Sequence, residues 1–163
     1  MKTMLANEIA TLLPRMRRFA RAITYHREDA DDLVQVAMER ALDKSEQWIP
    51  GTRLDSWMFR IMKNAWIDEV RSRTRRDSLF VPEEAGEHVG DDSAHAQQQR
   101  MAIQQAVSRL SEEHRLVVGL VLVDGMAYKE AAEVLEIPIG TLTSRLARAR
   151  EALQQLLSEK ART

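Results

Sequence analysis

Two basic stretches contain the residues best suited to binding chemistry. The first combines an amide and an indole with cations: Arg60, Lys63, Asn64, Trp66, Arg71, Arg73, Arg75 and Arg76. Guanidinium groups neutralise phosphates, while planar side chains stack on unpaired bases or hydrogen-bond to them. The stretch therefore fits a nucleic-acid backbone with exposed bases. A basic run alone is more often a solvated helix end above buried tryptophans, so this simpler alternative stays open.

The second stretch, residues 128–157, has the pattern of a helix-turn-helix. Ala131 and Ala132 are small enough for a second helix to cross the first closely, and Pro138 with Gly140 indicates the turn. Thr141 is the predicted N-cap of the second helix. The predicted outward face of that helix contains Thr143, Ser144, Ala147, Arg148 and Glu151. Short polar residues followed by arginine can enter a DNA major groove, which favours DNA binding over a plain helical hairpin.

Apolar residues at intervals of three and four predict helices that position the first basic stretch. One helix face contains Leu12, Leu13, Met16, Phe19, Ala20 and Ile23. A second helix, with Leu33 and Ala37 on its apolar face, begins among acids that suit a helix N-terminus: Glu28, Asp29, Asp31 and Asp32. Residues 50–52 (PGT) end this pattern. A third helix is predicted from about Leu54, with one face buried and the other basic. The buried face contains Trp57, Ile61 and Ala65, and Met58 and Met62 are further candidates for it.

Charge divides the chain into three parts, although the net charge is only −1. Residues 77–99 contain six acidic and no basic residues, together with Pro82, Gly86 and Gly90, and show no apolar periodicity. We therefore expect an all-α protein with two small helical domains, an N-terminal helical bundle (1–76) and a C-terminal helix-turn-helix domain (100–163). An acidic, flexible linker (77–99) joins them.

Composition excludes several other classes of protein. The sequence has no cysteine, so disulfides, thiolate metal sites and cysteine nucleophiles are excluded, and a cytoplasmic location fits best. No apolar run approaches the roughly 20 residues that span a bilayer, and no export signal is evident, so we expect no membrane insertion. The four histidines lie far apart, without metalloprotease spacing. We expect no catalytic residue, no metal and no cofactor, and hence no enzyme.

Several motifs together resemble the extracytoplasmic-function sigma factors, the smallest members of the main bacterial sigma family. In the C-terminal part these are residues 110–115 (LSEEHR), 124–132 (DGMAYKEAA) and 140–153 (GTLTSRLARAREAL). In the N-terminal part they are residues 29–35 (DADDLVQ), 57–64 (WMFRIMKN) and 68–71 (DEVR). Both motif sets occur in the family's order and cover most of the chain outside the linker. The resemblance implies a factor that recruits core RNA polymerase to promoter DNA and helps to melt it.

The resemblance also implies roles for N-terminal residues. Asp31, Asp32, Leu33 and Gln35 match the segment that docks on the clamp helices of the polymerase, where acids around an apolar centre suit a basic partner. Val36 stands where the family often has glutamate. Asn64 matches a residue that captures a flipped base of the minus-ten element. The cations expected to hold the non-template strand beside it are Lys63, Arg71, Arg73, Arg75 and Arg76.

In the C-terminal part, the resemblance assigns Ser144, Arg145 and Arg148 to the minus-thirty-five element. Thr143 belongs to the same expected surface, but many relatives have a basic residue there, so promoter preference should not be transferred from them. Arg145 ranks below Arg148, because it can instead contact a phosphate or fold back onto its own domain.

The implied partners are core RNA polymerase, promoter DNA and an anti-sigma factor, and the free chain is expected to be a monomer. Two other functions stay open. An ordinary helix-turn-helix regulator would bind duplex DNA tightly without polymerase. A sigma-like decoy would sequester an anti-sigma factor and would not need the DNA-facing Asn64 and Arg148.

Overall fold

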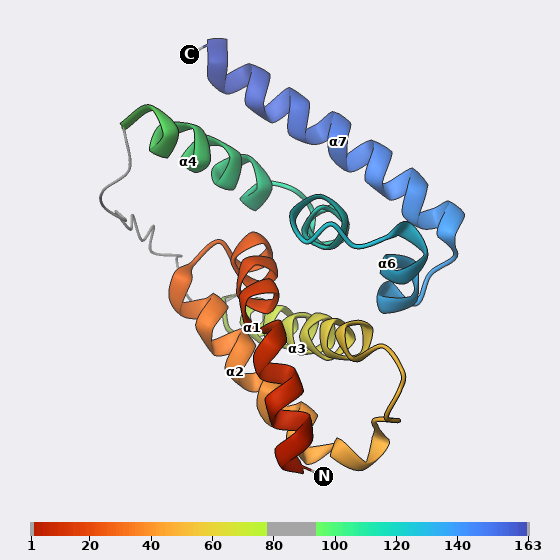
Figure 1. Cartoon of the computed structure of the whole chain (residues 1–163). Coiled ribbons are helices and arrows are strands. Elements are labelled where there is room, and N and C mark those ends of the chain that lie inside the picture. Colours follow the sequence, from red (N-terminus) through yellow and green to blue (C-terminus); the bar gives the residue numbers. More distant parts are fainter. Residues whose placement is uncertain (1, 78–93, 163) are drawn as a thin grey trace.

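The structure is a computed structural model that describes residues 2–77 and 94–162, and the described chain is helical without strands. This confirms the predicted all-α class. The N-terminal bundle consists of α1 (Lys2–Thr24), α2 (Arg27–Asp43), the short 3₁₀ helix η1 (Ser45–Gln47) and α3 (Leu54–Asp77). The C-terminal unit consists of α4 (Ala94–Ser108), α5 (Glu112–Val117), η2 (Val118–Val123), α6 (Tyr128–Leu135) and α7 (Ile139–Arg162). Figure 1 shows α4 alongside α7.

The apolar periodicity of α1 has the predicted consequence. Met16, Phe19 and Ile23 are completely buried. The Phe19 ring meets Phe59 of α3 edge-to-face, with 5.2 Å between ring centroids. Helix α2 begins among acids, with Glu28 and Asp29 in its first turn, as expected from the favourable interaction of carboxylates with a helix N-terminus. These three helices thus form one packed bundle.

Helix α3 is buried over more of its circumference than its sequence predicts. Trp57 is only half-buried, whereas Met58, Met62 and Trp66 are buried. Burial of Met58 and Met62 agrees with their candidacy for the apolar face. Trp66 is buried as in the alternative of a helix end above buried tryptophans, so its placement on the basic, base-stacking face was wrong. The reason is that α3 has neighbours on more than one side, since it contacts α1, α2 and α6.

The helix-turn-helix is present, but its second helix begins earlier than predicted. Glu136 ends α6 in a left-handed backbone conformation, with φ of 58°. Helix α7 then begins at Ile139, and the Leu142 N–H donates to the carbonyl of Pro138 at 3.1 Å. Thr141 consequently lies within the first turn, and its assignment as N-cap was wrong. Proline suits the start of a helix because it needs no partner for an N–H, so Pro138 sets the boundary.

The described residues reach into both ends of the predicted linker. Helix α3 continues to Asp77, and α4 already begins at Ala94. The remainder of the predicted linker, residues 78–93, lies outside the described residues. The linker interpretation therefore stays a prediction over most of its length.

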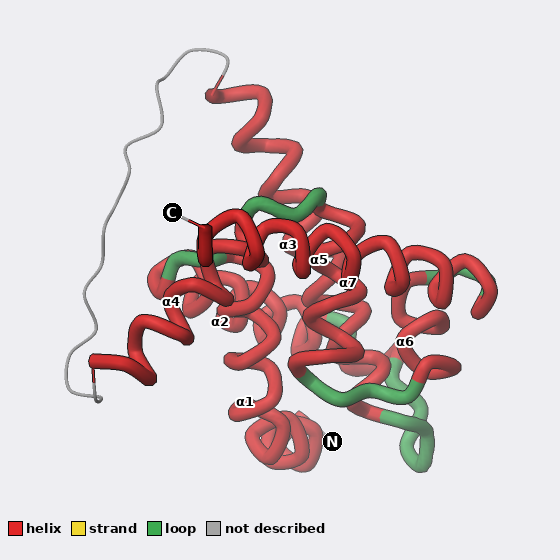
Figure 2. The backbone as a smooth tube through the Cα atoms, turned by 90° about the horizontal axis from the view of Figure 1, so that it is seen from above, coloured by secondary structure: helices red, strands yellow, loops and turns green. Residues whose placement is uncertain are grey.

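The N-terminal bundle and the C-terminal unit pack against each other, which the sequence did not predict. Helix α1 contacts α4, α5 and η2, and α3 contacts α6. Buried residues of both parts form one continuous hydrophobic cluster. Seen from above in Figure 2, α5 and α7 lie over the bundle. At Gly119 the two parts approach closely: a Cβ added there would lie 2.9 Å from the Phe19 Cε1 atom.

Candidate polymerase-binding and nucleic-acid surfaces

The acidic segment of α2 presents polar side chains around a buried leucine. Asp31, Asp32 and Gln35 are exposed, whereas Leu33 is only 6% exposed and belongs to the core. A cavity of about 540 Å³ lies between α2 and α3, and Asp32, Leu33, Gln35 and Val36 contribute to its lining. Val36, where relatives often have glutamate, is 38% exposed. The segment thus offers carboxylates beside a partly apolar hollow, which suits a basic helical partner.

The two residues predicted to begin the minus-ten surface, Lys63 and Asn64, lie in different environments. Asn64 is exposed on α3, where its amide can reach a base. Lys63 is buried, with a side chain only 7% exposed, and its Nζ atom lies 3.7 Å from a carboxylate oxygen of Glu136. The C-terminal unit therefore covers one predicted DNA-binding cation and leaves its neighbour accessible.

Arg73 is held by carboxylates of the bundle. Its Nη1 and Nη2 atoms donate to the two carboxylate oxygens of Asp29 at 2.9 and 2.6 Å, and its Nε atom donates to Glu69 at 3.2 Å. Hydrogen bonding to Asp29 raises the pKa of Arg73 above its usual range. Arg71 is exposed on the same helix, and the side chains of Arg75 and Arg76 lie outside the described residues. In this conformation Arg73 joins α3 to the start of α2.

A double-mutant cycle can show whether Asp29 is the working partner of Arg73. We expect Arg73→Ala and Asp29→Asn each to lower the free energy of unfolding by about 0.5 kcal/mol, because both changes remove the Arg73–Asp29 ion pair near the surface. Arg73→Ala also removes the pair with Glu69, so the double variant should lose little more than Arg73→Ala alone. Urea denaturation measures this coupling. Additive losses of stability together with weaker binding of Arg73→Ala to single-stranded DNA would instead identify Arg73 as a DNA contact.

The recognition surface on α7 brings together three of its four predicted residues. Ser144, Arg145 and Arg148 line a surface hollow of about 620 Å³, joined by His114 at the start of α5. Ser144 and Arg148 are exposed, whereas an Arg145 nitrogen lies 3.7 Å from a Glu113 carboxylate oxygen. Arg145 has thus folded back onto its own domain, one of its two expected positions.

The C-terminal surface differs from the prediction at two side chains, Thr143 and His114. The Thr143 hydroxyl donates to the carbonyl of Ile139 at 2.9 Å, so its hydrogen is used within the helix. The sequence did not identify His114 as part of this surface. Ser111 caps α5, the helix of His114, and its hydroxyl oxygen accepts from the His114 N–H at 3.3 Å. The capping serine in LSEEHR was the signal that could have located His114 in a first helical turn.

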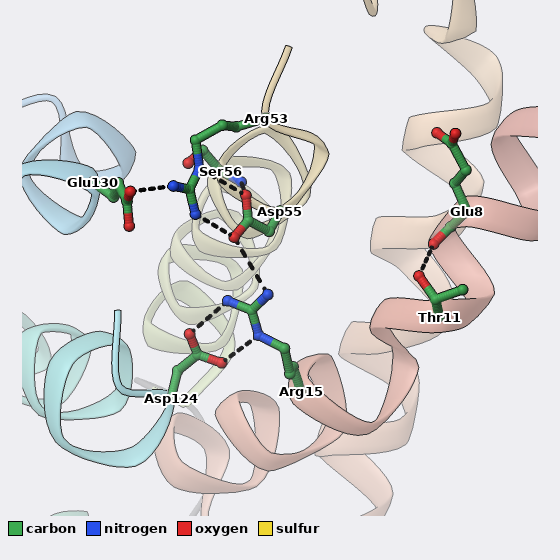
Figure 3. Close-up of polar contacts among 8 residues, drawn as sticks. All are labelled: Glu8, Thr11, Arg15, Arg53, Asp55, Ser56, Asp124 and Glu130. Carbon is green, nitrogen blue, oxygen red and sulfur yellow. Dashed lines mark hydrogen bonds and ion pairs between the residues drawn. The ribbon is translucent and has the colours of Figure 1, made fainter. Parts of the chain in front are cut away.

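A chain of ion pairs joins the bundle to the C-terminal unit (Figure 3). Arg15 of α1 donates to both carboxylate oxygens of Asp124, at 2.9 and 3.0 Å, and to Asp55 of α3 at 3.3 Å. Arg53 donates to Asp55 at 2.7 and 3.2 Å and also bonds to Glu130 of α6. The Asp124 side chain is fully buried. Charge-assisted pairs of this kind are stronger than neutral hydrogen bonds, so the network favours one relative placement of the two parts.

Asp55 gives the network a pH dependence. Burial raises the pKa of its carboxyl, but hydrogen bonds from Arg53 and the Ser56 N–H and the charges of Arg53 and Arg15 outweigh burial and lower it below the usual range. A carboxyl with a lowered folded-state pKa stabilises the fold above its unfolded pKa, and this contribution is lost as pH falls through the folded-state value.

We therefore expect the stability difference between the unmodified chain and Asp55→Asn to be constant above about pH 5 and to shrink below about pH 4. Denaturation with urea across this range measures the difference. Asp43→Asn is the matched control, because it removes an exposed acid at the end of α2, outside the network. A difference that stays constant down to about pH 2 would contradict the role of the Asp55 charge.

Comparison with known proteins identifies the family. Residues 9–76 match the family profile of Sigma-70 region 2, and residues 100–153 match that of Sigma-70 region 4. The chain is 30% identical over 153 residues to the ECF RNA polymerase sigma factor EcfG of Rhodopseudomonas palustris (strain TIE-1), covering 94% of this chain and 84% of that protein. It is 34% identical over 142 residues to SigM of Mycobacterium tuberculosis (strain ATCC 25618 / H37Rv), covering 87% of this chain and 71% of that protein.

Solved structures agree with this result. The sigma factor RpoE, in a co-crystal with the anti-sigma factor NepR from Bartonella quintana, superposes with a TM-score of 0.79 and 30% identity over 94% of this chain and 96% of that chain. CnrH in complex with the cytosolic domain of CnrY has a TM-score of 0.72 at 24% identity over 95% and 88% of the two chains, a likeness of fold alone. The chain therefore belongs to the extracytoplasmic-function (ECF) RNA polymerase sigma factors, a family of transcription initiation factors.

Among the described helices, none combines the length and the apolar character that crossing a membrane requires. Residues 2–77 and 94–162 likewise contain no group of three or more His, Asp or Glu side chains placed to hold a metal ion.

Proposed function

We propose that this chain directs core RNA polymerase to promoter DNA and helps to separate its strands. The observation that carries the proposal is the occurrence of both sigma regions in one chain, each with an exposed polar surface: Asp31, Asp32 and Gln35 on α2, and Ser144 with Arg148 on α7. The polymerase supplies the chemistry, and the chain itself acts by binding rather than by catalysis. We place this activity in the cytoplasm, where the polymerase and DNA are found.

The N-terminal bundle, residues 1–76 in our division of the chain, is the proposed reader of the minus-ten element. Exposed Asn64 would accept a base outside the stack, since an amide can both donate to and accept from a base edge. The cations proposed to hold the strand beside it are Lys63, Arg71, Arg73, Arg75 and Arg76. Lys63 and Arg73 are paired with the carboxylates of Glu136 and Asp29 in this structure, so they would have to exchange these partners for phosphates.

The C-terminal unit is the proposed reader of the minus-thirty-five element. Its surface offers Ser144 and Arg148 directly, while Arg145 would have to leave Glu113 to reach DNA. Thr143 can still accept a hydrogen bond, because its hydroxyl uses only its hydrogen in binding Ile139.

An anti-sigma factor is the proposed regulatory partner. Support comes from the similar RpoE, whose structure was solved in complex with the anti-sigma factor NepR. Such a partner would bind a free monomer of this chain.

Run-off transcription from a pool of promoters with purified core polymerase tests the proposed function. Transcripts that require this chain are the expected result. The absence of any transcript, with a folded chain and a polymerase that works with another sigma factor, would overturn the proposal.

Asn64→Ala should separate promoter melting from polymerase binding. Loss of a base contact of this kind costs about 1 to 3 kcal/mol, so we expect roughly 10-fold to 100-fold fewer open complexes on duplex promoters. Core affinity should be unchanged, because exposed Asn64 lies on α3 and not in the acidic segment of α2. Permanganate footprinting and a binding titration measure the two effects. Equal loss in both measurements would contradict the assignment.

A further inference from the structure

The corner between α1 and α2 exposes an aromatic side chain on a strained backbone. Tyr25 follows the last residue of α1 and has a φ of 70°, in the left-handed region where glycine or asparagine usually ends a helix. A bulky side chain meets a steric cost in this region. Tyr25 is 40% exposed, so deep burial of its ring does not offset that cost. Strained residues cluster at functional positions, which makes Tyr25 a candidate for one.

Contacts around the corner fix the position of Tyr25. Its N–H donates to the carbonyl of Arg21 at 3.2 Å, and Arg115 of α5 donates to the carbonyl of Ile23 at 2.9 Å. The Tyr25 ring meets the ring of His26 edge-to-face, with 5.2 Å between ring centroids. A ring that is already held in place loses little conformational freedom when a partner stacks on it.

Exposed cations lie on the two helices that meet at this corner. Arg21 follows Arg18 by three residues and Arg17 by four, so these three share one face of α1, where like charges repel one another. Arg27 is the first residue of α2, an end of a helix that disfavours a cation. Within residues 2–77 and 94–162, none of the four forms an ion pair with a carboxylate. The corner therefore offers unneutralised positive charge beside an exposed ring.

The corner lies at the end of the bundle to which the second half of α3 extends. Asp29, four residues after Tyr25, accepts hydrogen bonds from Arg73 of α3 at 2.6 and 2.9 Å. Arg73 and the exposed Arg71 are among the cations proposed to hold the separated promoter strand. A strand that follows these two arginines can therefore continue across the corner.

The chemistry of the corner fits an unpaired nucleic-acid strand. Aromatic rings stack on unpaired bases, and arginines beside them bind the backbone phosphates. An acidic protein segment would also be attracted to the arginines, but continuity with the proposed strand surface on α3 favours DNA.

We propose that the α1–α2 corner is a binding site for single-stranded DNA, in which Tyr25 stacks on one base and Arg21 and Arg27 bind flanking phosphates. This inference rests on the proposed function, because promoter melting supplies the unpaired strand. Arg17 and Arg18 extend the site along α1.

Substitutions of Tyr25 separate stacking from a structural role. Tyr25→Phe keeps the ring, whereas Tyr25→Gly and Tyr25→Asn remove it and suit a φ of 70°. The corner is exposed, so the whole chain can be titrated at low salt with fluorescent oligothymidine. We expect the two ring-free variants to bind roughly tenfold more weakly than the unmodified chain, and Tyr25→Phe to bind within about twofold of it.

Thermal unfolding of the same variants provides the control for stability. Tyr25→Gly and Tyr25→Asn should unfold at a temperature no lower than the unmodified chain, because both relieve the backbone strain. A ring that serves only the packing of the fold would give the opposite result, with lower unfolding temperatures and unchanged affinity for DNA. That result, or equal affinities across the Tyr25 variants, overturns the site.

An abasic strand of the same length shows whether the ring contacts a base. This strand keeps the phosphates, so the unmodified chain should bind it roughly tenfold more weakly than oligothymidine, whereas Tyr25→Gly should bind the two strands about equally. If Tyr25→Gly instead weakens binding to both strands by the same factor, the ring does not stack on a base and the proposal is wrong.

The dependence of affinity on salt tests the arginines. Arg21→Gln and Arg27→Gln should each reduce the slope of log affinity against log salt by about 0.7, the value for one phosphate contact on a single strand. Lys44→Gln is the matched control, because it removes one exposed cation at the other end of α2 and should leave the slope unchanged. Equal changes in all three variants would mean that DNA responds to the net charge of the chain, which contradicts a site at the corner.

Run-off transcription with core polymerase tests the proposed function separately. A chain that shows the expected losses of DNA affinity but yields no transcript contradicts the function and leaves the DNA site supported. A chain that transcribes normally, while all Tyr25 variants bind DNA equally, contradicts the site alone.

Discussion

Replacing Asp32 with arginine should weaken binding to core RNA polymerase about 100-fold, because a like charge placed against a basic helical partner costs several kcal/mol. Asp32 is exposed on α2 and forms no ion pair among the described contacts, so its reversal should leave the fold intact. Titration of the labelled chain with core polymerase measures the affinity. Melting of a duplex promoter should be restored at saturating polymerase, unlike the defect expected for Asn64→Ala.

Asp43→Arg provides the control for this charge reversal. Asp43 is an exposed acid at the last residue of the same helix, outside the proposed polymerase-binding segment. It should leave core affinity within about threefold of the unmodified chain, the size of a long-range effect screened by salt. If Asp43→Arg and Asp32→Arg weaken binding equally, binding depends on the net charge of the chain. That result would contradict a specific contact through the acidic segment of α2.

Replacing Phe19 with alanine should lower the free energy of unfolding by about 4 kcal/mol, the usual cost of deleting a buried aromatic ring. Phe19 is completely buried, packs edge-to-face on Phe59 and lies against Gly119 of η2. The ring therefore supports the bundle and its contact with the C-terminal unit at once. Guanidinium denaturation followed by circular dichroism measures the loss.

Phe19→Leu separates these two contributions of the ring. Leucine keeps an apolar side chain in the core and should cost about 1.5 kcal/mol. It also removes the ring atoms that a Cβ at Gly119 would meet, so Gly119→Ala should be better tolerated in the Phe19→Leu background than alone. Additive effects of the two substitutions would show that Phe19 and Gly119 do not meet in solution.

The elements of the fold could largely be predicted from the sequence, because the spacing of apolar residues shows which side of a helix is apolar. The spacing of Met16, Phe19 and Ile23 predicted a helix whose buried face the structure confirms. Pro138 likewise located the turn before α7, whereas Gly140, assigned to the same turn, lies within the first turn of α7. Boundaries were less secure: the general preference for threonine as N-cap pointed to Thr141, whereas Pro138 set the start of the helix.

The arrangement of the elements could not be predicted, because periodicity says that a face is buried but not against what. Lys63 was assigned to a basic surface, yet it is buried beside Glu136. For Trp66 the sequence left both a base-stacking and a buried position open, and the structure places it in the core. Arg115 and Asp124 carried no motif that would mark them as partners of α1 residues far away in the sequence. The individual contact residues of the polymerase and DNA surfaces stay predictions, based on the family's motifs and on the exposure of these side chains.

The π-helical segment η2 affects the direction of α7, the proposed DNA-binding helix. Its backbone bonds skip one residue more than those of an α-helix, as in the bond from the Asp124 N–H to the Gly119 carbonyl at 3.0 Å. Each residue turns an α-helix by about 100°, so removing this extra residue would rotate everything after it by that angle relative to α1. The added residue thus sets the rotation of the chain that follows it, including the Glu136 turn that lies against Lys63. Sequences that differ here by a single insertion or deletion would encode the same helices, but with α7 and its proposed DNA-binding surface in another orientation relative to α1.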